Sequence, residues 1–509
     1  MSSTVLALEE SVAAKRTSYG EILKSTALVG GSSALNIGIG IVRTKAMAML
    51  LGPAGFGLMG LYSSILDLAQ SVASMGVNSS GVRQIAEAAG SDEKERIART
   101  AIVLKRVSVV LGILGAILLV IISPQASALT FGNRDRTGAV TLLSVAVFLK
   151  VVSGGQGALI QGMRRLASLA KMNVLGAALG TLATIPIVYF YREQGVVPSL
   201  IAVGAASLAM SWWYTRQIDV PAVSVAASEV WHETAALLKL GFAFMATGLM
   251  MMGSAYAVRI IVLHKLGIEA TGLYQSAWTL GGLYVGFILQ AMGADFYPRL
   301  TAVYRDNLAC NRLVNEQARV GMLLAGPGII ATLTFAPIII ALFYNATFSG
   351  AVEALRWICL GVALRVITWP MGYIIIAKGE QALFFWTELA WTLVNVGLTW
   401  TCIGYFGLTG AGVAFFASYV FHGCLLYFVV RRLSGFRWSR ESRTTAQLFL
   451  VLVGLGLGGF YILPFYVALA IGAAVLIAMT AYSIRSLVSL IRTDCIPRPL
   501  RQLLRVAAA

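Results

Sequence analysis

Apolar runs of about 20 residues recur along almost the whole chain, and each is long enough to cross a bilayer as a helix. A membrane β-barrel would instead need short segments of alternating polarity, which this sequence lacks. Only 12% of the residues are charged, whereas soluble domains average about a quarter. We therefore predict an all-α polytopic membrane protein. Its fourteen predicted spans lie at residues 24–50, 53–80, 103–128, 138–160, 168–190, 196–214, 236–263, 270–297, 318–344, 350–376, 380–404, 409–430, 445–463 and 465–484.

The distribution of lysine and arginine predicts the orientation of these spans. If the N-terminus is inside, 29 of the 39 basic residues fall in or next to inner segments, five, including Arg259, fall in or next to outer segments, and the other five lie within spans. The positive-inside rule favours this arrangement, with both termini cytoplasmic. The net charge of +17 then reflects topology and attraction to lipid surfaces, and no soluble domain carries a basic face for nucleic acid.

Two stretches half a chain apart resemble each other, namely residues 42–84 and 258–299. An offset of 215 to 217 residues corresponds to six spans and a linker, and an even number of spans predicts parallel repeats. Chance similarity between glycine- and leucine-rich spans is the alternative. The aligned pairs are Leu51-Gly52 with Leu266-Gly267, Gly57-Leu58 with Gly272-Leu273, and Met75-Gly76 with Met292-Gly293.

The repeat predicts two lobes with additions at the C-terminal end. We expect a cytoplasmic N-terminal segment (1–21), an N-lobe (22–217), a linker (218–232), a C-lobe (233–432), an additional helix pair (433–486) and a basic cytoplasmic tail (487–509).

Charged residues inside the predicted spans are the candidate functional residues. A charge deep in a bilayer is costly and normally faces protein or water, so it marks a polar pathway. Arginine and lysine are the usual partners of phosphate groups. The predicted substrate-binding cations are Arg43, Lys45, Lys150, Arg259, Arg356 and Arg365, and the predicted coupling or charge-partner acids are Asp67 and Glu388.

Structural roles for several of these residues remain open. Arg43, Lys45 and Arg259 lie close enough to a predicted interface to reach lipid head groups. Arg356 has Glu353 one turn away as a partner. Asp67 is equally well placed to pair with Arg43 or Lys45 on the adjacent helix or to bind a cation.

Other classes of site find little support in the sequence. The five cysteines and three histidines form no metal-ligand spacing, so no metal site is predicted. No GxxxxGK[ST] loop is present, and no loop between spans exceeds about 25 residues. An ATP-driven exporter is therefore excluded, and no cofactor is expected.

Two segments carry a resemblance to a known superfamily. Residues 45–60 (KAMAMLLGPAGFGLMG) and 272–300 (GLYQSAWTLGGLYVGFILQAMGADFYPRL) resemble the polysaccharide-transport branch of the MATE-like (MOP) superfamily, which includes the Wzx-type flippases. The resemblance implies a bundle of twelve helices in parallel six-helix repeats, here with two extra C-terminal helices. It also implies a cationic central cavity and alternating access, and Lys45 matches the basic position of the family motif.

The function implied by this resemblance is transport of an undecaprenyl-pyrophosphate-linked oligosaccharide, such as an O-antigen repeat unit, across the bacterial inner membrane. Membrane lipids, H⁺ or Na⁺, and polysaccharide polymerase or chain-length machinery are the expected partners. A drug or cation antiporter is one alternative, although the first span carries Arg43 and Lys45 and no acid. A lipid II-type flippase is another. A glycosyltransferase or polymerase would need carboxylates on a long outer loop, which this chain lacks.

Overall fold

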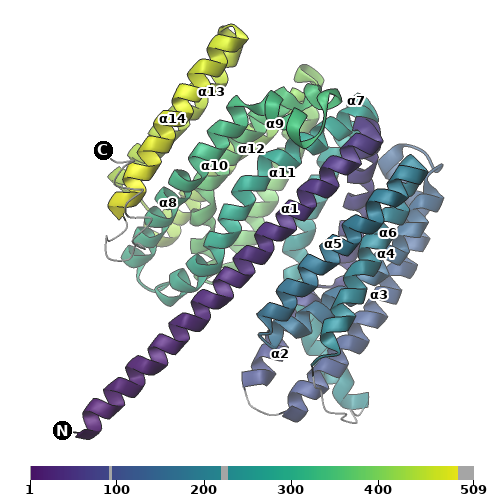
Figure 1. The fold of residues 1–509 in the computed structure, drawn as a ribbon, viewed down its shortest axis with the longest axis vertical. Coiled ribbons are helices and arrows are strands. Elements are labelled where there is room, and N and C mark those ends of the chain that lie inside the picture. Colours follow the sequence, from purple (N-terminus) through teal and green to yellow (C-terminus); the bar gives the residue numbers. More distant parts are fainter. Residues whose placement is uncertain (1, 91–93, 219–226, 491–509) are drawn as a thin grey trace. The chain divides into compact units, whose positions relative to one another are not determined.

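The computed structural model describes residues 2–90, 94–218 and 227–490, and every regular element within these ranges is a helix (Figure 1). The all-α prediction is confirmed. Short 3-10 turns at Arg192–Gly195 and Ala346–Ala351 precede α6 and α10. The α-helices are α1 (Ser2–Ser74), α2 (Val77–Gly90), α3 (Lys94–Phe131), α4 (Thr137–Gly162), α5 (Leu166–Tyr191), α6 (Val196–Thr215), α7 (Ala227–Ala302), α8 (Asn307–Thr334), α9 (Ala336–Phe343), α10 (Val352–Ala377), α11 (Gln381–Phe406), α12 (Thr409–Ser434), α13 (Arg440–Ile462) and α14 (Phe465–Leu490).

All fourteen predicted spans fall on helix. Ten helical stretches of the described chain are long and apolar enough to cross a membrane, and three of them each overlap two predicted spans. The predicted span at 318–344 is broken: α8 and α9 meet at an angle of 85°, where Pro337 enters the first turn of α9. Residues 219–226 of the predicted linker and 491–509 of the predicted basic tail lie outside the described ranges.

The chain forms two compact units. Unit 1 comprises residues 1–51 and 61–253, and unit 2 comprises residues 52–60 and 254–509. In unit 1, α4 packs against α2, α3 and α6, and α5 pairs with α6 (Figure 1). In unit 2, α10 packs against α8 and α12, and α11 packs against α12.

The two longest helices, α1 and α7, each contain a non-helical glycine at the aligned position of the repeat. Gly52 has φ 66° and ψ −174°, and Gly267 has φ 90° and ψ 177°. A side chain strains this left-handed region of φ, so glycine suits both positions. The shared geometry confirms the repeat at this point.

A second aligned pair makes a close reciprocal contact within unit 2. A Cβ atom on Gly57 would lie 2.5 Å from the carbonyl oxygen of Ile268, and one on Gly272 would lie 1.8 Å from that of Pro53. Pro53 and Ile268 also occupy aligned positions of the repeat. Only glycine permits backbones to approach this closely.

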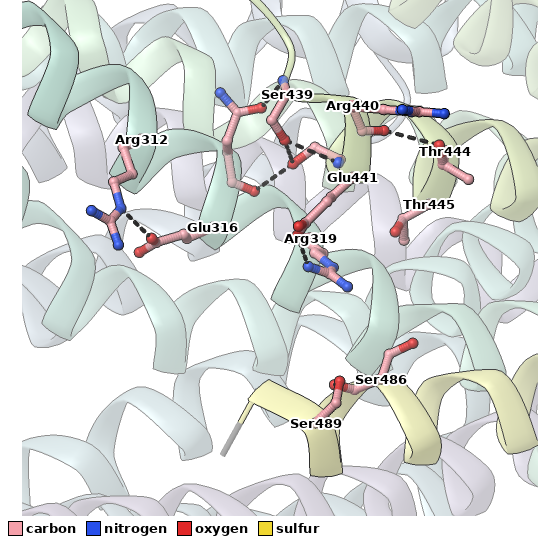
Figure 2. Close-up of polar contacts among 12 residues, drawn as sticks. Arg312, Glu316, Arg319, Ser439, Arg440, Glu441, Thr444, Thr445, Ser486 and Ser489 are labelled. Atoms are coloured by element: carbon pink, nitrogen blue, oxygen red, sulfur yellow. Dashed lines mark hydrogen bonds and ion pairs between the residues drawn. The ribbon is translucent and has the colours of Figure 1, made fainter. Parts of the chain in front are cut away.

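The additional helix pair is an integral part of unit 2. Both α13 and α14 pack along α8 (Figure 1), where a Cβ on Gly326 of α8 would lie 2.4 Å from Cε of Met479 in α14. Polar contacts fix the start of α13 (Figure 2): the Ser439 amide donates to Asn315 Oδ1 at 2.7 Å, and Ser442 Oγ donates to the Asn315 carbonyl at 3.0 Å. Arg319 of α8 also forms an ion pair with Glu441. The pair is therefore anchored by directional bonds as well as by apolar packing.

Candidate functional site

Unit 1 contains an open, partly polar cavity of about 700 Å³. This volume falls within the range of small-molecule sites, about 300 to 1,000 Å³. Five helices contribute to its wall, and neither an acidic nor an aromatic residue is among the lining residues. These are Arg43 and Gln70 of α1, Asn78, Ser79 and Val82 of α2, Lys150, Ser153, Gly154, Gly157, Ala158 and Gln161 of α4, Leu169, Met172, Asn173, Gly176 and Ala177 of α5, and Val203 and Ser207 of α6.

Small residues on one face of α4 and α5 leave this space open. A Cβ on Gly154 would lie 2.6 Å from Nδ2 of Asn78, so glycine lets the amide of α2 reach into the wall. On a different face of α4, a Cβ on Gly155 would collide with Ser108 of α3, which shows how tightly that face is packed. The glycine-rich run of α4 therefore packs against α3 on one face and borders the cavity on another.

Two of the predicted cations line the cavity, and they differ in their pairing. Lys150 Nζ lies 3.3 Å from Asp67 Oδ1. Arg43 is half-buried, and within the described part of the chain its guanidinium has no hydrogen-bond or ion-pair partner. Arg43, Lys150 and Asp67 together leave a formal charge of +1, carried by Arg43. The partner of Asp67 is thus Lys150 rather than Arg43 or Lys45, the two partners considered from the sequence.

Lys45 is not among the residues that line the cavity, although it is only two residues from Arg43. Its side chain is half-buried, and no residue in the described ranges pairs with it. Successive residues on a helix point about 100° apart, so Arg43 and Lys45 face different directions.

In unit 2, Arg259 and Arg356 are held by neighbouring groups. Arg259 donates to Gln275 Oε1 at 2.7 Å and to the Ala255 carbonyl at 3.0 Å. Arg356 is only 4% exposed, forms an ion pair with Glu353 at 2.5 Å and stacks over the ring of Phe460 in α13 at 3.6 Å. The pairing with Glu353 is the alternative raised from the sequence.

Arg365 and Glu388 belong to a separate cluster in unit 2. Both lie near Tyr419 of α12. Glu388 Oε1 of α11 lies 3.6 Å from Nε2 of His422, and His422 is buried with no hydrogen bond to either ring nitrogen in the described structure. His422 is not among the predicted site residues, because a single histidine in an apolar span does not indicate which helix it faces.

Comparison with known proteins identifies the family. Residues 46–353 match the model of a family described as polysaccharide biosynthesis protein. The chain belongs to this family. Within the polysaccharide biosynthesis family, the chain is 23% identical over 415 residues to the lipid III flippase of Escherichia coli (strain K12), covering 78% of this chain and 95% of that protein. The lipid III flippase of Shigella flexneri matches equally well.

Solved structures show the MOP-superfamily fold. An inward-facing multidrug resistance MATE family transporter has a TM-score of 0.66 at 17% identity, covering 81% of this chain and 94% of that chain. The lipid II flippase MurJ, in an inward closed conformation, has a TM-score of 0.65 at 13% identity, covering 91% of this chain and 99% of that chain. These matches confirm the MATE-like prediction.

Coverage of the MurJ structure extends to the additional helix pair. Residues before α13 make up 439 of 509, about 86% of the chain. A match that covers 91% must therefore continue past Ser439.

Proposed function

We propose that this protein is a flippase that moves a lipid-linked oligosaccharide from the cytoplasmic to the periplasmic leaflet of the bacterial inner membrane. The substrate we assign is an undecaprenyl-pyrophosphate-linked repeat unit of a polysaccharide such as O-antigen. Family membership and similarity to the lipid III flippases support this class of substrate.

The observation that carries the proposal is the unpaired Arg43 in a polar cavity of a membrane-embedded unit. A charge at the centre of a membrane span costs about 2.5 to 3.5 kcal/mol on insertion scales, so charged side chains in spans normally face protein or a water-filled cavity. Arg43 presents a planar fork of donors suited to a phosphate group, and Lys150 adds a second cation on the same wall. Alternating access would expose this cavity to each leaflet in turn.

Coupling to H⁺ or Na⁺ is assigned to Asp67 and Glu388, the acids within the spans. Asp67 offers its carboxylate beside the cavity, paired with Lys150. Glu388 faces His422, and histidine is the side chain whose charge changes most readily near neutral pH. Glu388→Gln is expected to remove the dependence of transport on an ion gradient while substrate binding persists. A polysaccharide polymerase or chain-length machinery on the periplasmic side would consume the product.

The test is deletion of the gene followed by analysis of lipid-linked intermediates. Accumulation of an undecaprenyl-pyrophosphate glycan in the cytoplasmic leaflet is expected. Normal glycans together with hypersensitivity to cationic drugs would instead indicate a drug or cation antiporter.

A lipid II-type flippase is the second candidate, favoured by the extension of the MurJ match into α13. Complementation separates the two proposals. Rescue of a strain depleted of its lipid III flippase, without rescue of one depleted of its lipid II flippase, is expected.

A further inference from the structure

Four side-chain amides line the cavity of unit 1 and form no hydrogen bond with the rest of the described chain. Gln70, Asn78, Gln161 and Asn173 come from α1, α2, α4 and α5, respectively. Gln70 and Asn78 are half-buried and Gln161 and Asn173 are exposed, so all four amides are accessible to a polar occupant of this space.

The chemistry of these groups differs from that of the cations. Each amide offers two N–H donors and a carbonyl acceptor, and Ser79, Ser153 and Ser207 add hydroxyl groups to the same wall. A sugar ring presents several hydroxyl groups that both donate and accept, and often an acetamido group, so it matches this set. An apolar acyl chain would leave the amides unpaired, and a pyrophosphate group would use only their donors.

We infer that this amide-lined wall binds the sugar residues attached to the pyrophosphate, and that it determines which glycan is accepted. The assignment rests on the proposed flippase function and assigns the two parts of the substrate to different side chains. Arg43 and Lys150 bind the pyrophosphate, and the amides bind the sugar. A site built from hydrogen-bonding groups discriminates strongly against a substrate that lacks the matching groups, since the site's own polar atoms then stay unpaired.

The test compares two probes on the purified full-length protein in nanodiscs. One is a short-chain polyprenyl pyrophosphate, and the other is the same lipid carrying N-acetylglucosamine. Gln161→Leu and Asn173→Leu are combined in one variant, and the exchanged amides, Gln161→Asn and Asn173→Gln, in a second that adds no charge. Gln381→Leu serves as the matched control, because Gln381 is exposed at the start of α11 in unit 2.

The double leucine variant is expected to weaken binding of the sugar-bearing probe at least about fivefold, with binding of the sugar-free probe unchanged. The exchanged variant keeps both amides and adds no charge, so retained preference for the sugar-bearing probe there excludes a packing defect. Equal weakening of both probes, or no weakening of either, would overturn the sugar assignment and leave the flippase proposal standing. If the unmodified protein binds neither probe, the flippase proposal fails together with this inference.

Discussion

Opposite effects of two neighbouring charge removals provide the sharpest test of the cavity. Arg43→Gln removes the unpaired cation and lowers the formal charge of Arg43, Lys150 and Asp67 from +1 to zero. Hydrogen bonds to charged groups contribute about 1.5 to 3 kcal/mol, so affinity for a polyprenyl pyrophosphate should fall about 10- to 150-fold. Asp67→Asn instead releases Lys150 from its partner at 3.3 Å and should tighten binding.

The gain from Asp67→Asn follows from Coulomb's law. For a phosphate group about 6 Å from the carboxylate, the repulsion removed is about 0.7 to 2.8 kcal/mol per unit of substrate charge, for effective dielectric constants of about 80 to 20. Isothermal titration calorimetry in nanodiscs measures both variants. Lys171→Gln is the control, because Lys171 is an exposed cation on α5 that does not line the cavity. If Asp67→Asn weakens binding as Arg43→Gln does, the cavity is not an electrostatic site for the anion.

Three further predictions concern packing and energetics. Gly272→Val places side-chain atoms against the Pro53 carbonyl oxygen, since even a Cβ would lie 1.8 Å from it. The melting temperature of this variant in detergent should be well below that of the control Gly282→Val, because no atom lies near a Cβ on Gly282. Arg356→Gln should lower the free energy of unfolding by about 1.5 to 3 kcal/mol, because Arg356 joins Glu353 to Phe460 of α13, while probe binding stays within twofold; a selective loss of binding would restore Arg356 to the substrate site. In proteoliposomes, an inside-negative potential of 100 mV should favour outward transport of a doubly charged pyrophosphate by up to about 4 to 5 kcal/mol, and indifference to potentials of either sign would exclude this driving force.

The helices were predictable because the bilayer imposes a length and a polarity on each span, and both are visible in the sequence. The glycine positions of the repeat were predictable for a similar reason, since a left-handed backbone at Gly52 and Gly267 restricts the choice of residue. The break between α8 and α9 was not predicted, because the run around Pro337 stays apolar on both sides of the bend. Hydropathy indicates which residues are apolar enough to lie in lipid, but it does not show where a helix changes direction.

Partners of the buried charges depend on helix rotation and on contacts between distant segments. Lys150 and Asp67 are 83 residues apart in sequence, and neither residue identifies the other. Glu388 and His422 meet through the packing of α11 against α12. Arg356 has its charge partner on the same helix, one turn away, and that pairing could be foreseen. Sequence therefore supplied the candidate charges, and only the structure separated those in a cavity from those in packed interfaces.

Two aligned arginines of the repeat differ in their bonding. Arg43 and Arg259 follow aligned valines at the start of the two repeated stretches. Arg259 is bound by Gln275 and the Ala255 carbonyl, whereas Arg43 borders the cavity without a partner in the described chain. An arginine already engaged must give up those bonds before it binds an anion. We therefore expect Arg43→Gln to lower affinity for a polyprenyl pyrophosphate at least about tenfold more than Arg259→Gln, measured on the same nanodisc preparations. Equal losses would mean that an unpaired arginine gives the anion no advantage over an arginine that is already hydrogen-bonded.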